Sequence, residues 1–193
     1  MKWNGLCFIS FLFTHFLAFG AGGGTDFGGR SSYAQLQELA FSKKKNYEDR
    51  WHAIMEIVDK FPDGAETVLI LASQEPEWFM KSAALVGLQK MNSPQRFKIS
   101  KALLTDKALV VRSQAVEILS QHRDPKTRQL LWAELDHPRN FRNKKSLWIR
   151  SQIAEYLATQ PLKSERAQFV RLFEDSDKKV KAASRAGLSK IPM

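Results

Sequence analysis

From residue 31 onward, apolar residues recur at intervals of three, four and seven along the chain. This spacing places them on one face of a helix, and the alternation typical of a half-buried strand fits none of these segments. Prolines, two of them directly after Ser or Asp, divide the pattern, and Ser-Pro or Asp-Pro is a typical helix start. These divisions fall at Pro62, Ser93-Pro94, Asp124-Pro125 and Pro161. The pattern predicts ten helices in five antiparallel pairs over residues 31–190.

The second helix of each predicted pair repeats one arrangement of residues. RSQAVEIL at 112–119 and RSQIAEYL at 150–157 are identical at five of eight positions. The basic residue that opens this motif recurs every 31 residues, except for one step of 38, at Arg50, Lys81, Arg112, Arg150 and Lys181. Mostly small residues follow three positions later, and large apolar ones seven positions later, at Ile57, Leu88, Leu119, Leu157 and Leu188.

A single helical pair cannot bury its own apolar stripe, whereas stacked pairs bury one another's. The repeat therefore predicts an all-α fold, an α-solenoid of about five helical hairpins in a right-handed superhelix. In the last repeat Ser184 and Arg185 replace inner apolar residues. We expect them to form a polar C-terminal cap.

Two stretches, Asp106…Val111-Arg112…Ala115…Leu119 and Asp175…Val180-Lys181…Leu188, resemble the HEAT repeat. The short period is most similar to the PBS-lyase HEAT-like subgroup, and the resemblance runs from about residue 33 to the C-terminus. It implies a hydrogen-bonded ladder of acidic and basic residues between repeats, with Asp106–Arg112 and Asp175–Lys181 as structural pairs. The family includes scaffolds, transport receptors, bilin lyases and DNA glycosylases, so the resemblance implies a fold and leaves the function open.

The acidic column of this ladder lies six residues before the basic one and reads Lys44, Glu75, Asp106, Lys144 and Asp175. Repeats one and four thus lack the acid. We therefore expect Arg50 and Arg150 to be freer to bind an external anion, unless Glu48 or Asp49 satisfies Arg50.

The first twenty residues have the pattern of a secretory signal peptide. Lys2 precedes a mostly apolar stretch at 6–19, and Ala18-Phe19-Gly20 supplies a small-residue cleavage site before Ala21. An uncleaved anchor helix is the alternative, but it needs about 20 apolar residues. We predict a signal peptide at 1–20, a glycine-rich flexible leader at 21–30 and the repeat domain at 31–193. The mature chain is then periplasmic or secreted and has no transmembrane segment.

Charge is the strongest compositional signal in these 193 residues, with 30 Lys and Arg against 20 Asp and Glu, or +10. The single cysteine, Cys7, lies in the predicted signal peptide and excludes a disulfide scaffold or a cysteine-rich zinc site. No HExxH, GxSxG or Walker-type glycine loop is present. We expect no enzyme activity, no cofactor and no metal site, with an acid pair hidden in a cleft as the alternative.

The longer step in the repeat inserts seven residues within 137–145, and residues 139–150 hold five basic residues and no acidic one. Function concentrates in such loops, where Arg and Lys supply charge-assisted hydrogen bonds and aromatic rings a stacking surface. The alternative is a solvated loop with a core tryptophan. The predicted binding residues are Arg139, Phe141, Arg142, Lys144, Lys145, Trp148 and Arg150, together with Arg112 and Arg50.

Other polar and aromatic positions have weaker functional readings. Ser82, Ser113 and Ser151 directly follow the basic column, and we expect them to line the inner face of the stack beside Gln side chains. Trp78 and Trp132 are expected to pack in the core. The lysine runs at 43–45 and 178–181 are expected to be solvated surface.

Together these features predict an exported, non-catalytic HEAT-repeat scaffold. Its basic concave face and the 137–150 loop would bind an acidic protein or a polyanionic envelope component. The alternatives are a nucleic-acid-binding, glycosylase-like protein and a bilin-lyase-like enzyme, and the export signal argues against both. The sequence leaves the oligomeric state open.

Overall fold

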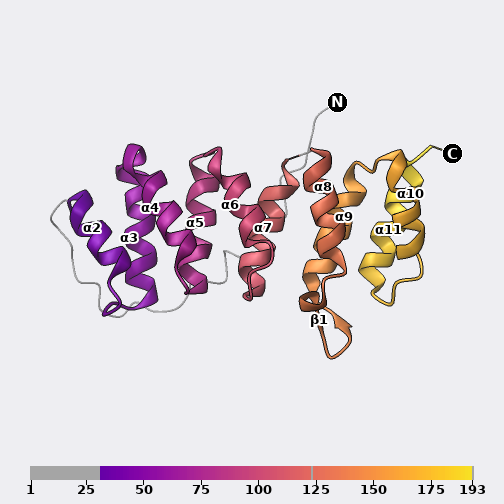
Figure 1. Cartoon of the computed structure of the whole chain (residues 1–193), viewed down its shortest axis with the longest axis horizontal. Helices are drawn as coiled ribbons and strands as arrows, with labels where there is room; N and C mark the ends of the chain where they lie inside the picture. The colour runs from indigo at the N-terminus through magenta and orange to yellow at the C-terminus, as the bar shows by residue number, and fades with distance from the viewer. Residues whose placement is uncertain (1–30, 123, 193) are drawn as a thin grey trace. The chain divides into compact units, whose positions relative to one another are not determined.

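The computed structural model describes residues 31–122 and 124–192, so the predicted signal peptide at 1–20 and leader at 21–30 lie outside the described residues. The described part is all-α with one short hairpin of strands (Figure 1). Its ten α-helices are α2 (Tyr33–Phe41), α3 (Tyr47–Lys60), α4 (Pro62–Gln74), α5 (Trp78–Lys90), α6 (Gln95–Leu103), α7 (Leu109–Ser120), α8 (Pro125–Leu135), α9 (Trp148–Thr159), α10 (Arg166–Leu172) and α11 (Lys178–Lys190).

Within the compact unit Tyr33–Met193, successive helices pair into hairpins: α2 with α3, α4 with α5, α6 with α7, α8 with α9 and α10 with α11. The second helices form a continuous row, because α3 contacts α5, α5 contacts α7, α7 contacts α9 and α9 contacts α11. The all-α helical repeat fold is thereby confirmed. The winding of the row into a right-handed superhelix stays a prediction.

The repeating columns fill equivalent buried positions in successive hairpins. Ile57, Leu88, Leu119 and Leu157 are fully buried, and the small residues Ala53, Ala84 and Ala115 are buried four positions before the large ones on the same helices. Small side chains let neighbouring helices approach closely while large ones fill the space between them. Ser184, expected to form a polar cap, is instead fully buried, and its hydroxyl donates to the carbonyl of Phe169.

Helices begin at Pro62 and at Asp124-Pro125 as predicted, whereas α6 begins at Gln95, with Pro94 as its N-cap. The Asp124 carboxylate caps α8 by accepting from the Thr127 backbone N–H at 3.0 Å. Pro161, however, does not begin a helix. A 3₁₀ turn, η2 (Lys163–Glu165), intervenes, and α10 begins only at Arg166. The cause is Glu165, whose buried carboxylate accepts from the Leu162 N–H and from Arg128, and this fixes a separate turn before the helix.

The seven-residue insertion folds into a projecting hairpin. After the 3₁₀ turn η1 (Pro138–Asn140), strands β1 (Phe141–Arg142) and β2 (Lys145–Ser146) pair antiparallel, with Arg142 opposite Lys145. Asn143 and Lys144 connect them with φ of 51° and 62°. Positive φ at both central residues is the requirement of a type I′ turn, whose twist matches paired strands. We refer to residues 141–146 as the basic hairpin, which extends from the lower edge of the helical row in Figure 1.

Across residues 31–122 and 124–192, no helix combines the length and apolar composition that a bilayer crossing requires.

The stacked columns predict how substitutions will differ in stability. Leu119→Ala removes a fully buried side chain and should lower the free energy of unfolding by about 2–5 kcal/mol. Leu130 on α8 is 41% exposed, and Leu130→Ala should change the free energy by less than about 0.5 kcal/mol. Urea denaturation of both variants measures the difference. Equal losses would contradict the equivalence of the buried columns.

Candidate functional site

Three of the predicted binding residues lie inside the protein and are not available to a ligand. Arg50, Arg112 and Arg150 are only 3%, 2% and 2% exposed. The expectation that Arg50 and Arg150 are freer to bind an external anion is wrong, and the acid that pairs with Arg50 is neither Glu48 nor Asp49. Arg50 donates to the Ala40 carbonyl and pairs with Glu77 at 3.2 Å, and its Nη2 atom is buried without a partner among the described residues. A buried guanidinium requires acceptors, and neighbouring hairpins supply them here.

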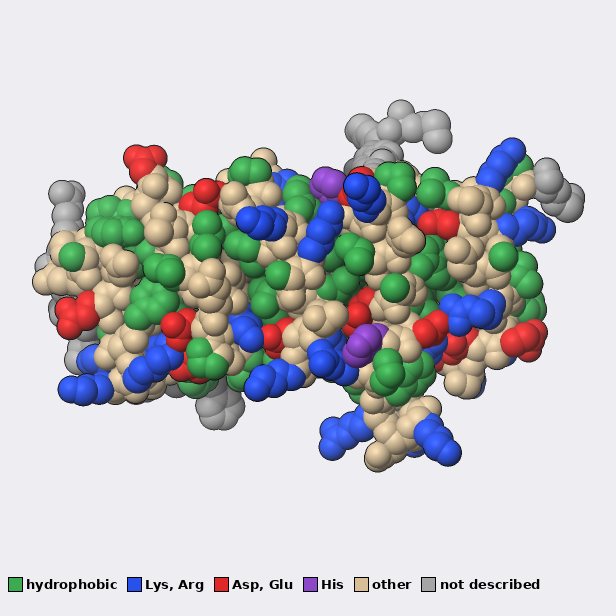
Figure 2. All heavy atoms as spheres, in the orientation of Figure 1, with side chains coloured by type: hydrophobic (Ala, Val, Ile, Leu, Met, Phe, Trp, Pro, Cys, Tyr) green, Lys and Arg blue, Asp and Glu red, His purple; other side chains and the backbone are tan. Residues whose placement is uncertain are grey.

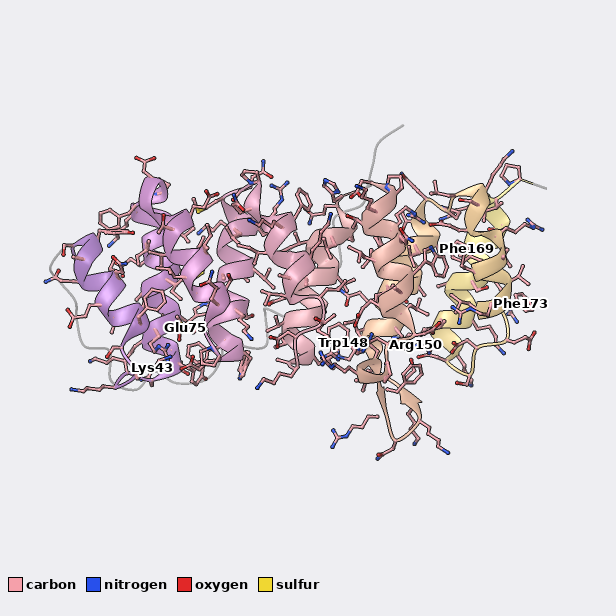
Figure 3. The ribbon with its side chains drawn as sticks, in the orientation of Figure 1. Lys43, Glu75, Trp148, Arg150, Phe169 and Phe173 are labelled. Carbon is pink, nitrogen blue, oxygen red and sulfur yellow. The ribbon has the colours of Figure 1, made fainter. Side chains whose placement is uncertain are left out.

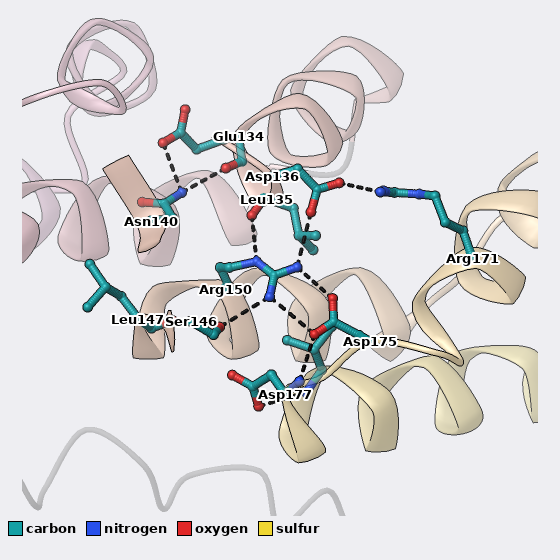
Figure 4. A network of polar contacts seen from close by, with 11 residues as sticks. Glu134, Leu135, Asp136, Asn140, Ser146, Leu147, Arg150, Arg171, Asp175 and Asp177 are labelled. Atoms are coloured by element: carbon teal, nitrogen blue, oxygen red, sulfur yellow. Dashed lines mark hydrogen bonds and ion pairs between the residues drawn. The ribbon is translucent and has the colours of Figure 1, made fainter. Parts of the chain in front are cut away.

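Arg150 shows the arrangement most completely (Figure 4). Its Nε atom donates at 3.0 Å to the carbonyl of Leu135, the last residue of helix α8. Its Nη2 atom lies 3.1 Å from the Asp136 carboxylate and 2.7 Å from the Asp175 carboxylate. One cation thus joins α8, its own helix α9 and the loop of the next hairpin.

The expected pairs between a basic residue and the acid six residues before it are wrong, because Lys81 and Arg150 pair with an acid of the following repeat. Lys81 pairs with Asp106 at 2.6 Å, as Arg150 does with Asp175, in each case 25 residues further along. Arg112 does not meet the Asp106 carboxylate and instead donates to its carbonyl at 2.8 Å. The predicted Asp175–Lys181 pair is likewise absent among the described residues, because Asp175 is held by Arg150.

The insertion supplies the partner of Arg112. No acid lies 25 residues after Arg112, where the other two pairs have theirs. The amide oxygen of Asn140 takes its place and accepts from Arg112 at 3.2 and 3.3 Å. Asn140 is itself fully buried and donates to the Glu134 carbonyl and carboxylate at 2.7 and 3.1 Å.

Ion pairing lowers the pKa of the ladder acids. Hydrogen bonds from Lys43, and further ones from Arg50, lower the pKa of Glu77 to about 2. Burial acts to raise the pKa of Asp106 and Asp175, but hydrogen bonds from Lys81 and Arg150 respectively outweigh it, and both pKa values lie below the ordinary value. All three acids are therefore charged at neutral pH.

The serine row is also internal. Ser82 donates to Gln114 at 2.7 Å, and Ser113 donates to Gln152 at 2.9 Å, so each hydroxyl joins one second helix to the next. Ser151 turns back to the Trp148 carbonyl. These three serines are therefore not open to a ligand, because their hydrogen bonds are made within the stack and all three residues are buried.

The remaining predicted residues gather around the basic hairpin. Arg142, Lys144 and Lys145 are exposed, and none forms an ion pair with a described residue. Figure 2 shows blue Lys and Arg side chains at the tip of the basic hairpin. Phe141 lies 4.5 Å from the Arg150 guanidinium and anchors the stem, while Arg139 donates to the Thr105 carbonyl. Trp148, at the base, is 47% exposed (Figure 3).

A second feature was not foreseen from the sequence. Four large apolar side chains stand exposed at the first or second residue of four successive second helices. They are Tyr47 (46%), Trp78 (50%), Val110 (38%) and Trp148 (47%). We call this row the aromatic edge. Trp78 was expected in the core and is not there, whereas Trp132 does pack, edge-on to Phe169 with ring centroids 4.9 Å apart. The signal was present, since each of the four lies two or three residues before the basic column.

Cations line the same edge of the array, where the two helices of each hairpin connect. Besides those of the basic hairpin, five lysines there are exposed and form no salt bridge in the described part of the chain: Lys44, Lys45, Lys107, Lys178 and Lys179. The acids of the α4–α5 connection do not oppose them, because Lys43 binds Glu75 at 2.5 Å and Glu77 at 2.8 Å (Figure 3). The edge thus combines unpaired positive charge with exposed aromatic rings.

Among the described residues no group of His, Cys, Asp and Glu side chains has the arrangement of a metal site. No protein-family model matches the chain, and no curated protein matches it in sequence.

The ladder predicts a large loss of stability at one arginine and a small loss at another that lies eight residues away. Arg150→Ala leaves Asp136, Asp175 and the Leu135 carbonyl without their donor and should destabilise the fold by about 3–5 kcal/mol. Arg142→Ala removes an exposed, unpaired side chain and should cost less than about 0.5 kcal/mol. Thermal and urea unfolding measure both. An Arg150→Ala protein as stable as the parent would contradict a structural role for this cation.

The lowered pKa of Glu77 predicts acid sensitivity. A folded-state pKa of about 2 against an ordinary value of 4.5 gives stability that is fully present above pH 4.5 and is lost as the pH falls toward 2. Glu77→Gln should remove this contribution to stability and flatten the dependence of the unfolding free energy on pH between about 4.5 and 2. Glu38→Gln, at an exposed position on α2, serves as the control. An unchanged profile for Glu77→Gln would rule out its ion pairs as the source.

Proposed function

We propose that this chain is an exported, non-catalytic HEAT-like binding protein whose basic hairpin and aromatic edge hold an acidic or polyanionic partner. The observation that carries the proposal is the contrast between two sets of cations. The ladder cations Arg112 and Arg150 are buried and bonded to acceptors, whereas Arg142, Lys144 and Lys145 project into solvent with no acid opposite them. Unpaired, clustered positive charge raises the local concentration of anions and speeds their association.

The turn of the basic hairpin supports a role for its charge. Lys144 has φ of 62°, a conformation that costs a side chain with Cβ roughly 1–2 kcal/mol and that glycine adopts freely. A lysine is kept at the tip where glycine would fold with less strain. Strained residues of this kind cluster at functional sites, because the surrounding structure has to hold them in place.

The stem of the basic hairpin is rigidly attached. The Leu147 N–H donates to the Asn140 carbonyl at 2.8 Å, and Asn140 is fixed by Arg112. A held hairpin loses less conformational entropy on binding than a free loop does, so its charges are pre-organised for a partner. Carboxylate and phosphate groups both accept charge-assisted hydrogen bonds from such Arg and Lys side chains.

Nucleic acid is the second candidate, and Trp148 is the observation that favours it. An exposed indole beside several cations is the combination that single-stranded nucleic acids use, with bases stacked on the ring. The predicted signal peptide argues against this candidate. Binding of an oligonucleotide that weakens steeply between about 50 and 200 mM salt would favour it.

Charge reversal tests the proposal. The triple variant Arg142→Glu, Lys144→Glu, Lys145→Glu should bind heparin or polyglutamate at least about tenfold more weakly, because the attraction becomes repulsion. The matched control reverses three exposed cations outside the edge, Lys126, Lys163 and Arg166, and should retain most of the binding. Fluorescence anisotropy at low salt measures both, with circular dichroism as the check on folding. Equal loss in the two variants would show that net charge alone acts and would overturn the proposed site.

A further inference from the structure

Building on the proposed function, we propose that the partner is an acidic, proline-rich polypeptide segment that lies along the aromatic edge in the polyproline II conformation. Four exposed apolar side chains, one from each of four neighbouring helices, carry this inference: Tyr47, Trp78, Val110 and Trp148. They form a single file, because α3, α5, α7 and α9 contact one another in that order. A single file of contacts fits an extended chain.

The interval between these side chains selects the conformation of that chain. Packed helices lie about 8–10 Å apart, so successive members of the row are separated by about that distance. Polyproline II has three residues per turn and rises about 3.1 Å per residue, so every third side chain recurs on the same face after about 9 Å. A β-strand repeats a face after about 7 Å and would drift out of step along the row.

A helical partner fits the edge less well. An amphipathic helix binds by laying a stripe of i, i+3, i+4 and i+7 side chains into an apolar groove. The aromatic edge offers one exposed large apolar side chain from each of four hairpins, and three of the connections before them carry exposed lysines, such as Lys45, Lys107 and Lys145.

The rings of the row are supported from below. Tyr47 and Trp78 each pack edge-on to Phe79, with centroids 6.0 and 6.2 Å apart, and the Arg50 guanidinium lies 4.9 Å from the Phe79 ring. Rings held in this way present fixed apolar surfaces to a ligand. Exposed aromatic surfaces of this type bind proline-rich segments, whose preformed conformation loses little entropy on docking.

The cations beside the row specify the charge of the segment. In polyproline II, two of every three residues point away from the face that touches the rings. On this edge those residues would meet Lys44, Lys107 and the side chains of the basic hairpin, which lack acidic partners in the described structure. Asp or Glu at one of these two positions would supply them, so each three-residue turn of the ligand combines prolines with an acidic residue.

Synthetic peptides test the inference on the full mature chain. A fluorescent peptide of repeated Pro-Pro-Glu units, about fifteen residues long, spans the row at about 3.1 Å per residue. It should bind at least about tenfold more tightly than a Gly-Gly-Glu peptide of the same length and charge, which is a flexible coil. It should also bind more tightly than an uncharged Pro-Pro-Gln peptide.

Variants of the row make the test specific to this surface. Trp78→Ala lies outside the basic hairpin and should weaken binding of the Pro-Pro-Glu peptide about tenfold, as loss of a central aromatic contact does. Val110→Trp completes the aromatic row and should strengthen binding about threefold or more. Leu130→Ala removes an equally exposed apolar side chain from α8, away from the edge, and should leave the affinity unchanged.

The outcomes separate this inference from the function on which it rests. If Gly-Gly-Glu, or a helical Glu-rich peptide, binds as tightly as Pro-Pro-Glu, the polyproline II partner is wrong, while the acidic partner of the proposed function stands. Unchanged affinity in both Trp78→Ala and Val110→Trp overturns the docking row in the same way. If neither the peptides nor heparin binds the parent protein, both proposals fail.

Discussion

The structure depends on the need of a buried guanidinium or ammonium group for acceptors. Arg150 lies between the carbonyl group that ends helix α8 and an acid of the next hairpin, and Lys81 likewise pairs with an acid of the next hairpin. Breaking such a pair leaves an uncompensated buried charge, which is among the costliest changes a core can undergo. The ladder therefore fixes how successive hairpins sit against one another at this edge, while the apolar columns fill the space between the helices.

The acids of the ladder are paired with cations of the scaffold. This pairing determines which charged side chains at the surface remain without a partner. Asp106, Asp175 and Glu77 are held by cations of the scaffold and do not neutralise the lysines nearby. At this edge, the exposed cations that form no salt bridge with a described residue lie in or beside the connections and in the basic hairpin. Structural pairing inside and free charge outside thus arise from the same loops, and the candidate site lies directly over the part of each hairpin that is held most firmly.

The sequence predicted the fold far better than the site, for physical reasons. Leu88, Leu119 and Leu157 recur with a helical period, and periodicity reports directly on which positions are buried. Charge carries no such signal, since Arg150 and Arg142 look alike in a sequence although one is buried and the other exposed. The acceptors of Arg150 lie 15, 14 and 25 residues away, and only the packed hairpins bring them together. The core prediction for Trp78 was wrong for a related reason. Trp78 is the first residue of its helix, and a large apolar residue there is exposed when the neighbouring hairpins pack against later turns of the helix.

The insertion gives the contact between the third and fourth hairpins a chemistry unlike that of the other contacts between hairpins. Between the first and second, second and third, and fourth and fifth hairpins, a carboxylate receives the cation, and protonation weakens such a contact. Between the third and fourth, Arg112 meets the amide of Asn140, which does not titrate. The same amide, however, donates to the Glu134 carboxylate, whose pKa burial raises above its ordinary value. Acidification therefore protonates Glu134 at this contact before it protonates Asp106 or Asp175, whose pKa values are lowered. The insertion that displays the basic hairpin thus also places, at the hairpin's base, a carboxyl group whose pKa is shifted in the opposite direction from those of the ladder acids.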